Sequence, residues 1–429
     1  MHTTQRLLAH LLFVMTSCAF ADEPRVPDVN DMTRLMDGNR FQAARAQLAK
    51  DHDRIVQDII QLTEIPAPPF KEEARARAYM QMLKAHGLRD VEMDAEGNVM
   101  GLREGTDGRS LLVVTAHLDT VFPEDTDVKV RRKGDRLFAP GIADDVSSLA
   151  VLLGFIRALD EARIITRSDI LFMGNVGEEG PGDLRGVRYL FTRGKYKDRI
   201  THFISFESGR ARITDAGVGS RRYVIAFKGP GGHSMRDFGL VNPAYAMAGA
   251  ITEIAKLHVP SEPRTVFNVG VVEGGTSVNS IPFEVSMTVD LRSDGAAELR
   301  DLDSRFLGVL STAAAAENAA RSTAKGAISV DVKLIGDRPV GSTPRSADIV
   351  NIAAAALLAA GETPQFEAGS TDSNIPMSLG IPAVTLRSGF LAERIHSLEE
   401  SLLLDQQETV KHMAIGLATV LAIAGPATK

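Results

Sequence analysis

The sequence Leu-Leu-Val-Val-Thr-Ala-His-Leu-Asp, residues 111–119, runs from an apolar stretch directly into a histidine and an aspartate. Its first four residues are typical of a buried β-strand, and His117 and Asp119 follow where that strand ends. In open α/β sheets, ligands bind in the crevice outside the carboxyl ends of the strands. The stretch therefore predicts an α/β sheet with a functional site at the end of this strand.

Side chains of the types that bind metal ions recur along the chain, near the ends of predicted strands and the start of a predicted helix. The pair Glu178-Glu179 follows one predicted strand, and Glu207 follows the next. Asp144 opens a predicted helix, and His396 lies between the last predicted strand and the last predicted helix. Histidines and carboxylates that converge on one sheet edge are typical of a two-metal hydrolytic centre.

The order of the predicted elements indicates two domains. Strands and helices alternate in the first half of the chain and again near its end, which favours a mostly parallel sheet flanked by helices. Between these parts the order changes to β-α-β-β-α-β, the ferredoxin-like unit. We expect a catalytic α/β domain, residues 22–217 and 337–429, interrupted by an inserted α+β lid domain, residues 218–336. A chain of 429 residues is long enough for both.

The first 21 residues predict a cleavable secretory signal. Arg6 provides the positive charge that precedes the apolar segment of a signal peptide, and Leu7–Met15 is that apolar segment. Ala19–Ala21 fits a cleavage site after Ala21. A buried N-terminal helix is the alternative, and lipid attachment at Cys18 is a further one. We expect a secreted or periplasmic protein. Because Cys18 is the only cysteine, the mature chain would hold metals through nitrogen and oxygen ligands alone.

Composition excludes two classes of partner. The formal net charge is −7 and no basic stripe runs along the chain, which argues against binding to nucleic acid. The last apolar segment, residues 417–424, is far too short to span a bilayer. We therefore expect neither a nucleic-acid partner nor a membrane span after the signal.

His117 and Asp119 have the spacing of a metal ligand and its support. Residues two apart on an extended segment point the same way. A ligating imidazole usually has its second nitrogen held by a carboxylate, which fixes the orientation of the ring. We therefore expect His117 to bind metal and Asp119 to orient it. A histidine in an ordinary turn is the alternative.

Asp144-Asp145 and Glu178-Glu179 are acidic pairs whose members can have different roles. The two oxygens of one carboxylate can bridge two cations, which suits Asp144. Asp is also a preferred N-cap residue, which suits Asp145. In the second pair, one carboxylate can bind metal while the other takes a proton from metal-bound water. A solvated acidic loop is the alternative for that pair.

In this order and combination, the motifs resemble those of the M20 metallopeptidases. This family includes carboxypeptidase G2-like, aminoacylase-like, desuccinylase-like and tripeptidase-like dizinc hydrolases. The resemblance extends over most of the mature chain. The matching motifs are Thr115–Val121, Gly141–Asp145, Gly177–Gly180, Phe206-Glu207 and His396-Ser397.

The resemblance implies two Zn²⁺ ions per chain, with Co²⁺ or Mn²⁺ as substitutes. It also implies that Glu178 is the general acid/base, that Asp119 orients His117, and that a cis peptide bond follows Asp144. The implied ligands are His117 and Glu207 on one ion, Glu179 and His396 on the other, and Asp144 on both.

The inserted domain resembles its counterpart in the family in Gly231–Ser234 and Asn242–Ala244. In the family the histidine of this motif, here His233, reaches the active site of a neighbouring subunit and polarises the scissile carbonyl. The resemblance therefore implies a homodimer formed through the lid domain. Segments that grip a substrate carboxylate in relatives match here at Asn279, Arg292 and Ser370-Thr371-Asp372. The alternative is that these are turn and strand-end residues that only shape the lid.

Glu207 bears on the subclass of hydrolase. In the family this position tends to be Asp in aminopeptidases and dipeptidases, and Glu in carboxypeptidases and acyl-amino-acid hydrolases. We therefore expect cleavage of a peptide or N-acyl amide bond next to a free carboxylate, through a metal-bridging hydroxide, with a small peptide or N-acyl amino acid as substrate. The alternatives are an aminopeptidase or tripeptidase acting on free-amine peptides, and a catalytically silent binding protein of the same fold. Val146-Ser147-Ser148 departs from the family's usual Lys-Gly-Gly and leaves the subfamily open.

Overall fold

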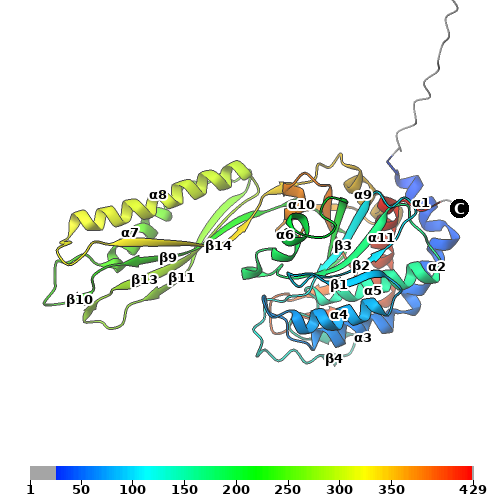
Figure 1. Cartoon of the computed structure of the whole chain (residues 1–429), viewed down its shortest axis with the longest axis horizontal. Coiled ribbons are helices and arrows are strands. Elements are labelled where there is room, and N and C mark those ends of the chain that lie inside the picture. Colours follow the sequence, from blue (N-terminus) through cyan, green and yellow to red (C-terminus); the bar gives the residue numbers. More distant parts are fainter. Residues whose placement is uncertain (1–25, 428–429) are drawn as a thin grey trace, which may run out of the picture.

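The computed structural model describes residues 26–427. The predicted signal and Cys18 lie outside these residues, so the signal and the secreted or periplasmic location stay predictions. Figure 1 shows a large α/β body, with the four-stranded sheet of the inserted segment projecting from one side. Within residues 26–427, no helix is both long and apolar enough to cross a membrane.

The large body is built on a nine-stranded sheet whose centre is parallel. β3 (Leu111–His117) lies between β6 (Asp169–Asn175) and β7 (Ile200–Glu207), and β17 (Ala383–Arg387) extends β7 in the same direction. Because parallel strands end at the same edge, the segments that follow them lie side by side. The other strands of this sheet are β1 (Arg89–Met93), β2 (Val99–Arg103), β8 (Arg212–Gly217), β15 (Gly341–Ser342) and β16 (Gln365–Gly369).

Successive residues of β3 enter different hydrophobic cores. Leu112 and Val114 belong to one core, and Leu111 and Val113 to the core on the opposite face. A strand that is buried on both faces is apolar throughout, which explains the apolar stretch seen in the sequence. Helices cover both faces of the sheet (Figure 1). The first face packs against α1 (Val29–Asp37), α2 (Asn39–Lys50), α3 (His52–Thr63), α4 (Glu73–Lys84), α5 (Val146–Glu161), α9 (Asp348–Ala359) and α11 (Gln406–Ala424), and the second against α6 (Arg185–Thr192) and α10 (Asn374–Ser378).

A small antiparallel sheet brings a late segment of the chain to the edge of the large sheet. Its strands are β4 (Arg131–Lys133), β5 (Arg136–Phe138), β18 (Leu391–Glu393) and β19 (Ser401–Leu403). The loop between β18 and β19 contains His396. Pairing of β19 with β5 therefore places this histidine near the residues that precede α5.

The inserted segment forms an antiparallel sheet with two helices packed on one face. Along the chain the order is β-α-β-β-α-β, apart from the short pair β10 (Gly232–His233) and β12 (Ser280–Ile281), so the predicted order is correct. The predicted fold class is confirmed, whereas the domain boundaries at residues 218 and 336 stay predictions. The main elements are β9 (Gly219–Lys228), α7 (Pro243–Ile254), β11 (Thr265–Gly274), β13 (Glu284–Ser293), α8 (Ala296–Ala320) and β14 (Ser329–Arg338).

Arg75 fixes the segment that follows β3. It lies in α4, its side chain is buried, and its guanidinium donates hydrogen bonds to the carbonyls of Ile65 and Leu118, each at 2.7 Å. Leu118 separates His117 from Asp119, so this contact holds the start of the candidate site against α4.

We expect Arg75→Ala to lower the free energy of unfolding by about 2–5 kcal/mol, because two carbonyls lose their donor. Urea denaturation followed by circular dichroism measures the change. Arg77→Ala is the matched control, since Arg77 pairs with Glu73 on an exposed face of the same helix. It should change the free energy of unfolding by less than about 0.5 kcal/mol. Equal losses in the two variants would contradict the role given to Arg75.

Candidate metal centre

The five predicted metal ligands line one cavity of about 460 Å³. His117 ends β3, Glu207 ends β7, and Glu179 lies in the turn after β6. Asp144 precedes α5, and His396 comes from the β18–β19 loop. Segments that are remote in the sequence therefore meet at the carboxyl edge of the sheet.

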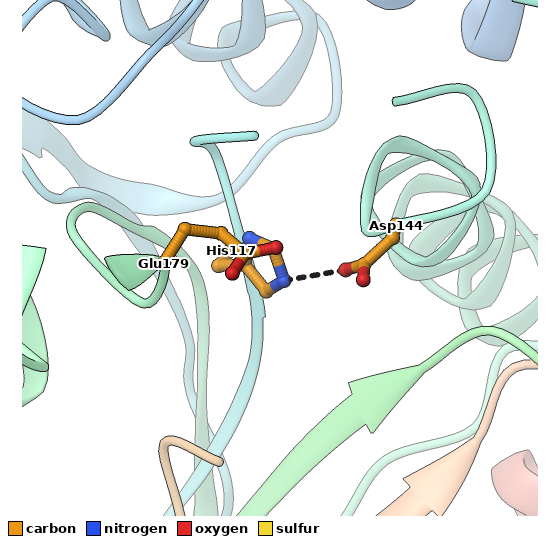
Figure 2. Close-up of side chains that lie close together, drawn as sticks. All are labelled: His117, Asp144 and Glu179. Atoms are coloured by element: carbon orange, nitrogen blue, oxygen red, sulfur yellow. Dashed lines mark hydrogen bonds and ion pairs between the residues drawn. The ribbon is translucent and has the colours of Figure 1, made fainter. Parts of the chain in front are cut away.

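The two carboxylate oxygens of Asp144 face different histidines. Oδ1 lies 2.9 Å from His117 Nε2, the contact drawn in Figure 2, and Oδ2 lies 3.1 Å from His396 Nε2. His396 Nε2 is also 2.9 Å from Glu179 Oε1, and His117 Nε2 is 3.9 Å from Glu207 Oε1. One carboxylate thus stands between two groups of ligands, as a bridging residue requires.

The side chains of the cavity suit divalent cations. Ligand atoms of His117, Asp144 and Glu179 lie within 4.8 Å of one another, as do those of His117, Asp145 and Glu207. Burial raises the pKa of Glu207, and the neighbouring Asp145 and Asp144 raise it further. Buried carboxylates that crowd in this way are stabilised by added positive charge. Imidazole nitrogen and carboxylate oxygen are ligands that zinc and related metals accept, so the donor set fits a metal cofactor.

Glu400 joins the two segments that carry Asp144 and His396, and we did not predict it. Its buried carboxylate accepts the backbone N–H groups of Ala143 and Asp144 at 2.8 and 3.1 Å through one oxygen. The other oxygen accepts the N–H of His396 at 3.2 Å. In the sequence Glu400 is one of two adjacent glutamates, and only its distance of four residues from His396 distinguishes it.

Asp145 does not cap α5 as its position suggested. It occupies the N-cap position, but its side chain makes no cap hydrogen bond. Its Oδ2 accepts the backbone N–H of His117 at 3.1 Å instead, so it ties the start of α5 to the end of β3. The peptide bond between Asp144 and Asp145 is cis, as the family resemblance implied.

Asp119 supports the site differently from the way we predicted. The nearest acceptor for His117 Nδ1 is the Asp119 backbone carbonyl at 3.0 Å, whereas the closest Asp119 carboxylate oxygen is 3.7 Å away. The carboxylate accepts the backbone N–H groups of Glu178 and Glu179 at 3.0 and 2.7 Å. An unpaired buried N–H group would be costly. Asp119 therefore fixes the turn that carries both glutamates as well as the imidazole.

Glu178 lies in the cavity beside an arginine that the sequence did not reveal. Arg338, at the end of β14, donates from Nη1 to Glu178 Oε1 at 3.1 Å and also donates to the Glu178 carbonyl. Both side chains are buried. Burial raises the pKa of Glu178, and the positive charge of Arg338 opposes that shift. Two further arginines that we did not predict, Arg222 and Arg387, line the same cavity.

Most of the predicted substrate-binding residues also lie at the cavity. The side chain of Arg292 is 41% exposed, and only its Nε contacts Asp290 closely, at 2.7 Å, so the rest of the guanidinium can meet a ligand. Asp372 is buried instead and accepts a hydrogen bond from Asn175 Nδ2 at 2.7 Å. The predicted residues that line the cavity are Arg292, Ser370 and Thr371.

His233 and Asn279 lie outside the cavity of the single chain. His233 belongs to β10 and Asn279 directly precedes β12, and these two strands pair at the end of the inserted sheet far from the large body (Figure 1). His233 Nδ1 accepts the N–H of Met235 at 3.2 Å, and Asn279 is exposed. The prediction for His233 concerns a neighbouring subunit, and it stays a prediction.

Comparison with known proteins agrees with this geometry. Residues 113–423, more than half of the chain, match the model of peptidase family M20/M25/M40. The chain belongs to this family. It is therefore an M20-family hydrolase, and both the family and the class of enzyme expected from the sequence are confirmed.

Individual relatives support the same fold. Carboxypeptidase G2 of Pseudomonas sp. (strain RS-16) is 24% identical over 215 residues, 48% of this chain and 51% of that enzyme, so the match spans about half of its length. Aminopeptidase PepT of Bacillus cereus ATCC 10987 superposes with a TM-score of 0.69 at 23% identity, covering 87% of this chain and 99% of that one. The YXEP protein of Bacillus subtilis is a dinuclear metal binding peptidase from the M20 family. It superposes with a TM-score of 0.63 at 16% identity, covering 87% of this chain and 99% of that one.

We expect Asp144→Ala to reduce the bound divalent metal to less than about half of the wild-type content, because the carboxylate that faces both histidines is lost. Elemental analysis by mass spectrometry after dialysis measures the content. His258→Ala, which replaces an exposed histidine of the inserted segment, is the control and should bind as much metal as wild type. Full metal content in Asp144→Ala would show that Asp144 is not a shared ligand.

Proposed function

We propose that this chain is a dizinc hydrolase that cleaves a peptide or N-acyl amide bond next to a free carboxylate. One observation carries the proposal: Asp144 faces both histidines in a cavity that also contains Glu178 and Arg292. These groups provide a metal site, a carrier for a proton and an anchor for an anion, which are the parts that such a hydrolysis needs.

The five ligands would hold two zinc ions. His117 and Glu207 would bind one ion, His396 and Glu179 the other, and Asp144 both. When bound, the ions would acidify a water molecule and polarise the scissile carbonyl. Zinc accepts this set of nitrogen and oxygen ligands, and Co²⁺ or Mn²⁺ could replace it.

Glu178 is positioned to carry the proton. Its carboxylate lies in the cavity, and burial raises its pKa above that of an exposed glutamate. A carboxylate with a raised pKa accepts a proton from water more readily and can pass it to the leaving amine. Arg338 holds the side chain in place during this transfer, because it binds both the carboxylate and the backbone carbonyl.

Arg292, Ser370 and Thr371 would bind the free carboxylate of the substrate. A guanidinium group can hold a carboxylate through two parallel hydrogen bonds. Glu207 supports cleavage next to that carboxylate, because this position tends to be Glu in carboxypeptidases and acyl-amino-acid hydrolases of the family. The similarity to carboxypeptidase G2 supports the same assignment. The leaving group is then an amino acid held by its carboxylate.

We expect Glu178→Gln to lower kcat by about 10²–10⁴-fold while the metal content stays at the wild-type value. Glutamine fills the same space but cannot take up the proton. Steady-state kinetics on N-acyl amino acids and on the matched free-amine peptides, together with metal analysis, measures both quantities.

Glu161→Gln is the control for this variant, since Glu161 is an exposed glutamate at the end of α5 and should keep the wild-type rate. Undiminished turnover in Glu178→Gln would contradict the role of Glu178. Faster hydrolysis of the free-amine peptides than of their N-acyl counterparts would favour an aminopeptidase instead. Full metal with no hydrolysis of any compound would favour a binding protein.

We further propose that two copies pair through the inserted domain, so that His233 completes the cavity of the other copy. β11 and β14 are the edge strands of the inserted sheet, and both expose apolar side chains. Exposed apolar edge strands tend to pair with another chain. The exposed side chains include Val271, Val272, Val332 and Leu334.

Mixing the variants Glu178→Ala and His233→Ala tests this pairing. Each variant alone should be inactive, but half of the dimers in an equal mixture are mixed, and each mixed dimer has one intact cavity. After dissociation and reassembly, the mixture should therefore recover about a quarter of the wild-type activity. Sedimentation velocity checks that dimers are present. A mixture no more active than its components would exclude the exchange of His233 between copies.

A further inference from the structure

Arg387 lines the cavity but has no part in the function proposed above. It ends β17, and its register partner on the neighbouring strand β7 is Glu207. The guanidinium is near enough for its charge to oppose the effect of burial on the pKa of Glu207. Arg387 therefore stands at the Glu207 end of the ligand cluster.

Within the described residues, the guanidinium of Arg387 does not use all of its hydrogen-bond donors. Its Nη2 forms an ion pair with Glu367, whose other carboxylate oxygen lies 2.8 Å from Nη1 of Arg212, so one carboxylate serves two guanidinium groups. Arg387 Nη1 is 3.5 Å from the carbonyl of Ser208, at the limit of a hydrogen bond. The buried Nε has no hydrogen-bond partner in the part of the chain that the structure describes. Because the buried Nε is closed to solvent, Nη1 is the donor that keeps hydrogen-bonding capacity for an anion in the cavity that Arg387 lines.

Two further arginines enter the cavity from the inserted domain. Arg222 of β9 and Arg292 of β13 both line it, and they share the carboxylate of Asp290 at 3.3 and 2.7 Å. Arg222 Nη1 donates to the carbonyl of Gly180 at 3.2 Å, which places this pair beside the turn after β6. Arginines therefore line the cavity at two places besides Arg338, one next to the inserted domain and one next to Glu207.

We propose that the substrate is anionic at both ends, and that its acyl group is a dicarboxylic acid whose free carboxylate binds Arg387. The inference rests on the proposed function, in which Arg292 holds the carboxylate of the leaving amino acid. The acyl part then extends from the scissile bond toward Glu207, where a second carboxylate meets Nη1 of Arg387. The same positive charge repels the ammonium group of a free-amine peptide, so Arg387 also selects against that class.

A pair of substrates tests the inference. N-succinyl and N-succinamoyl derivatives of one amino acid differ only in whether the distal group is a carboxylate or a neutral amide. For a panel of amino acids, wild type should prefer the succinyl compound by about 10–100-fold in kcat/KM, since a hydrogen-bonded charge pair is at stake. Arg387→Gln should lose most of this preference. Arg387→Lys keeps the charge without the planar fork and should retain part of it.

Arg212→Gln is the matched control. It removes the other ion pair of Glu367, and the Arg212 side chain is 54% exposed, so the succinyl preference should remain. Equal loss of the preference in Arg212→Gln and Arg387→Gln would overturn the inference, because the effect would then come from the shared ion pairs. Hydrolysis of N-acyl amino acids with no succinyl preference in wild type would overturn this inference alone. Absence of hydrolysis of every N-acyl amino acid would overturn the proposed function and this inference with it.

Discussion

The crowding of buried carboxylates around Asp144 is the constraint on which the rest of the site depends. Asp144, Glu178, Glu179 and Glu207 share one cavity, and burial raises the pKa of Glu178 and of Glu207, which favours their neutral forms. Such a group can stay ionised only where positive charge enters it. In this chain the imidazoles and the surrounding arginines supply part of that charge, and a metal cofactor would supply the rest.

Three buried charged side chains hold the loops that carry the ligands. Arg75 binds the carbonyl that follows His117, and Asp119 binds the two amides of the glutamate turn. Glu400 accepts hydrogen bonds from the backbone N–H groups of Asp144 and His396, and so joins the two segments that carry these ligands. In each case the side chain satisfies backbone groups, and the charged Arg75 forms stronger hydrogen bonds than a neutral donor would. These contacts within the chain therefore fix the loops that carry the ligands.

The sequence allowed prediction of the parallel strands and their ligands for a physical reason. Strands buried on both faces are continuous apolar runs, and polar residues at their ends stand out against that background. Arg338, Arg387 and Glu400 do not stand out, because a charged residue that enters a cavity has the same local sequence as one that meets water. Only tertiary packing separates the two cases. His233 and Asn279 were recognisable from two separate motifs, yet the structure of one chain places both outside the cavity. Only the role predicted for His233 involves a second copy.

The position of Arg338 in the chain links two parts of the molecule. It is the last residue of β14, the strand through which the chain leaves the inserted sheet, and it binds Glu178 through both side chain and backbone. Arg222 of the same sheet binds the carbonyl of Gly180, two residues further on. A change in the angle between the two bodies would therefore displace the turn that bears Glu178. Substitutions in the segments that join the two bodies would therefore act on the position of Glu178 through Arg338 and Gly180 without lying in the cavity themselves.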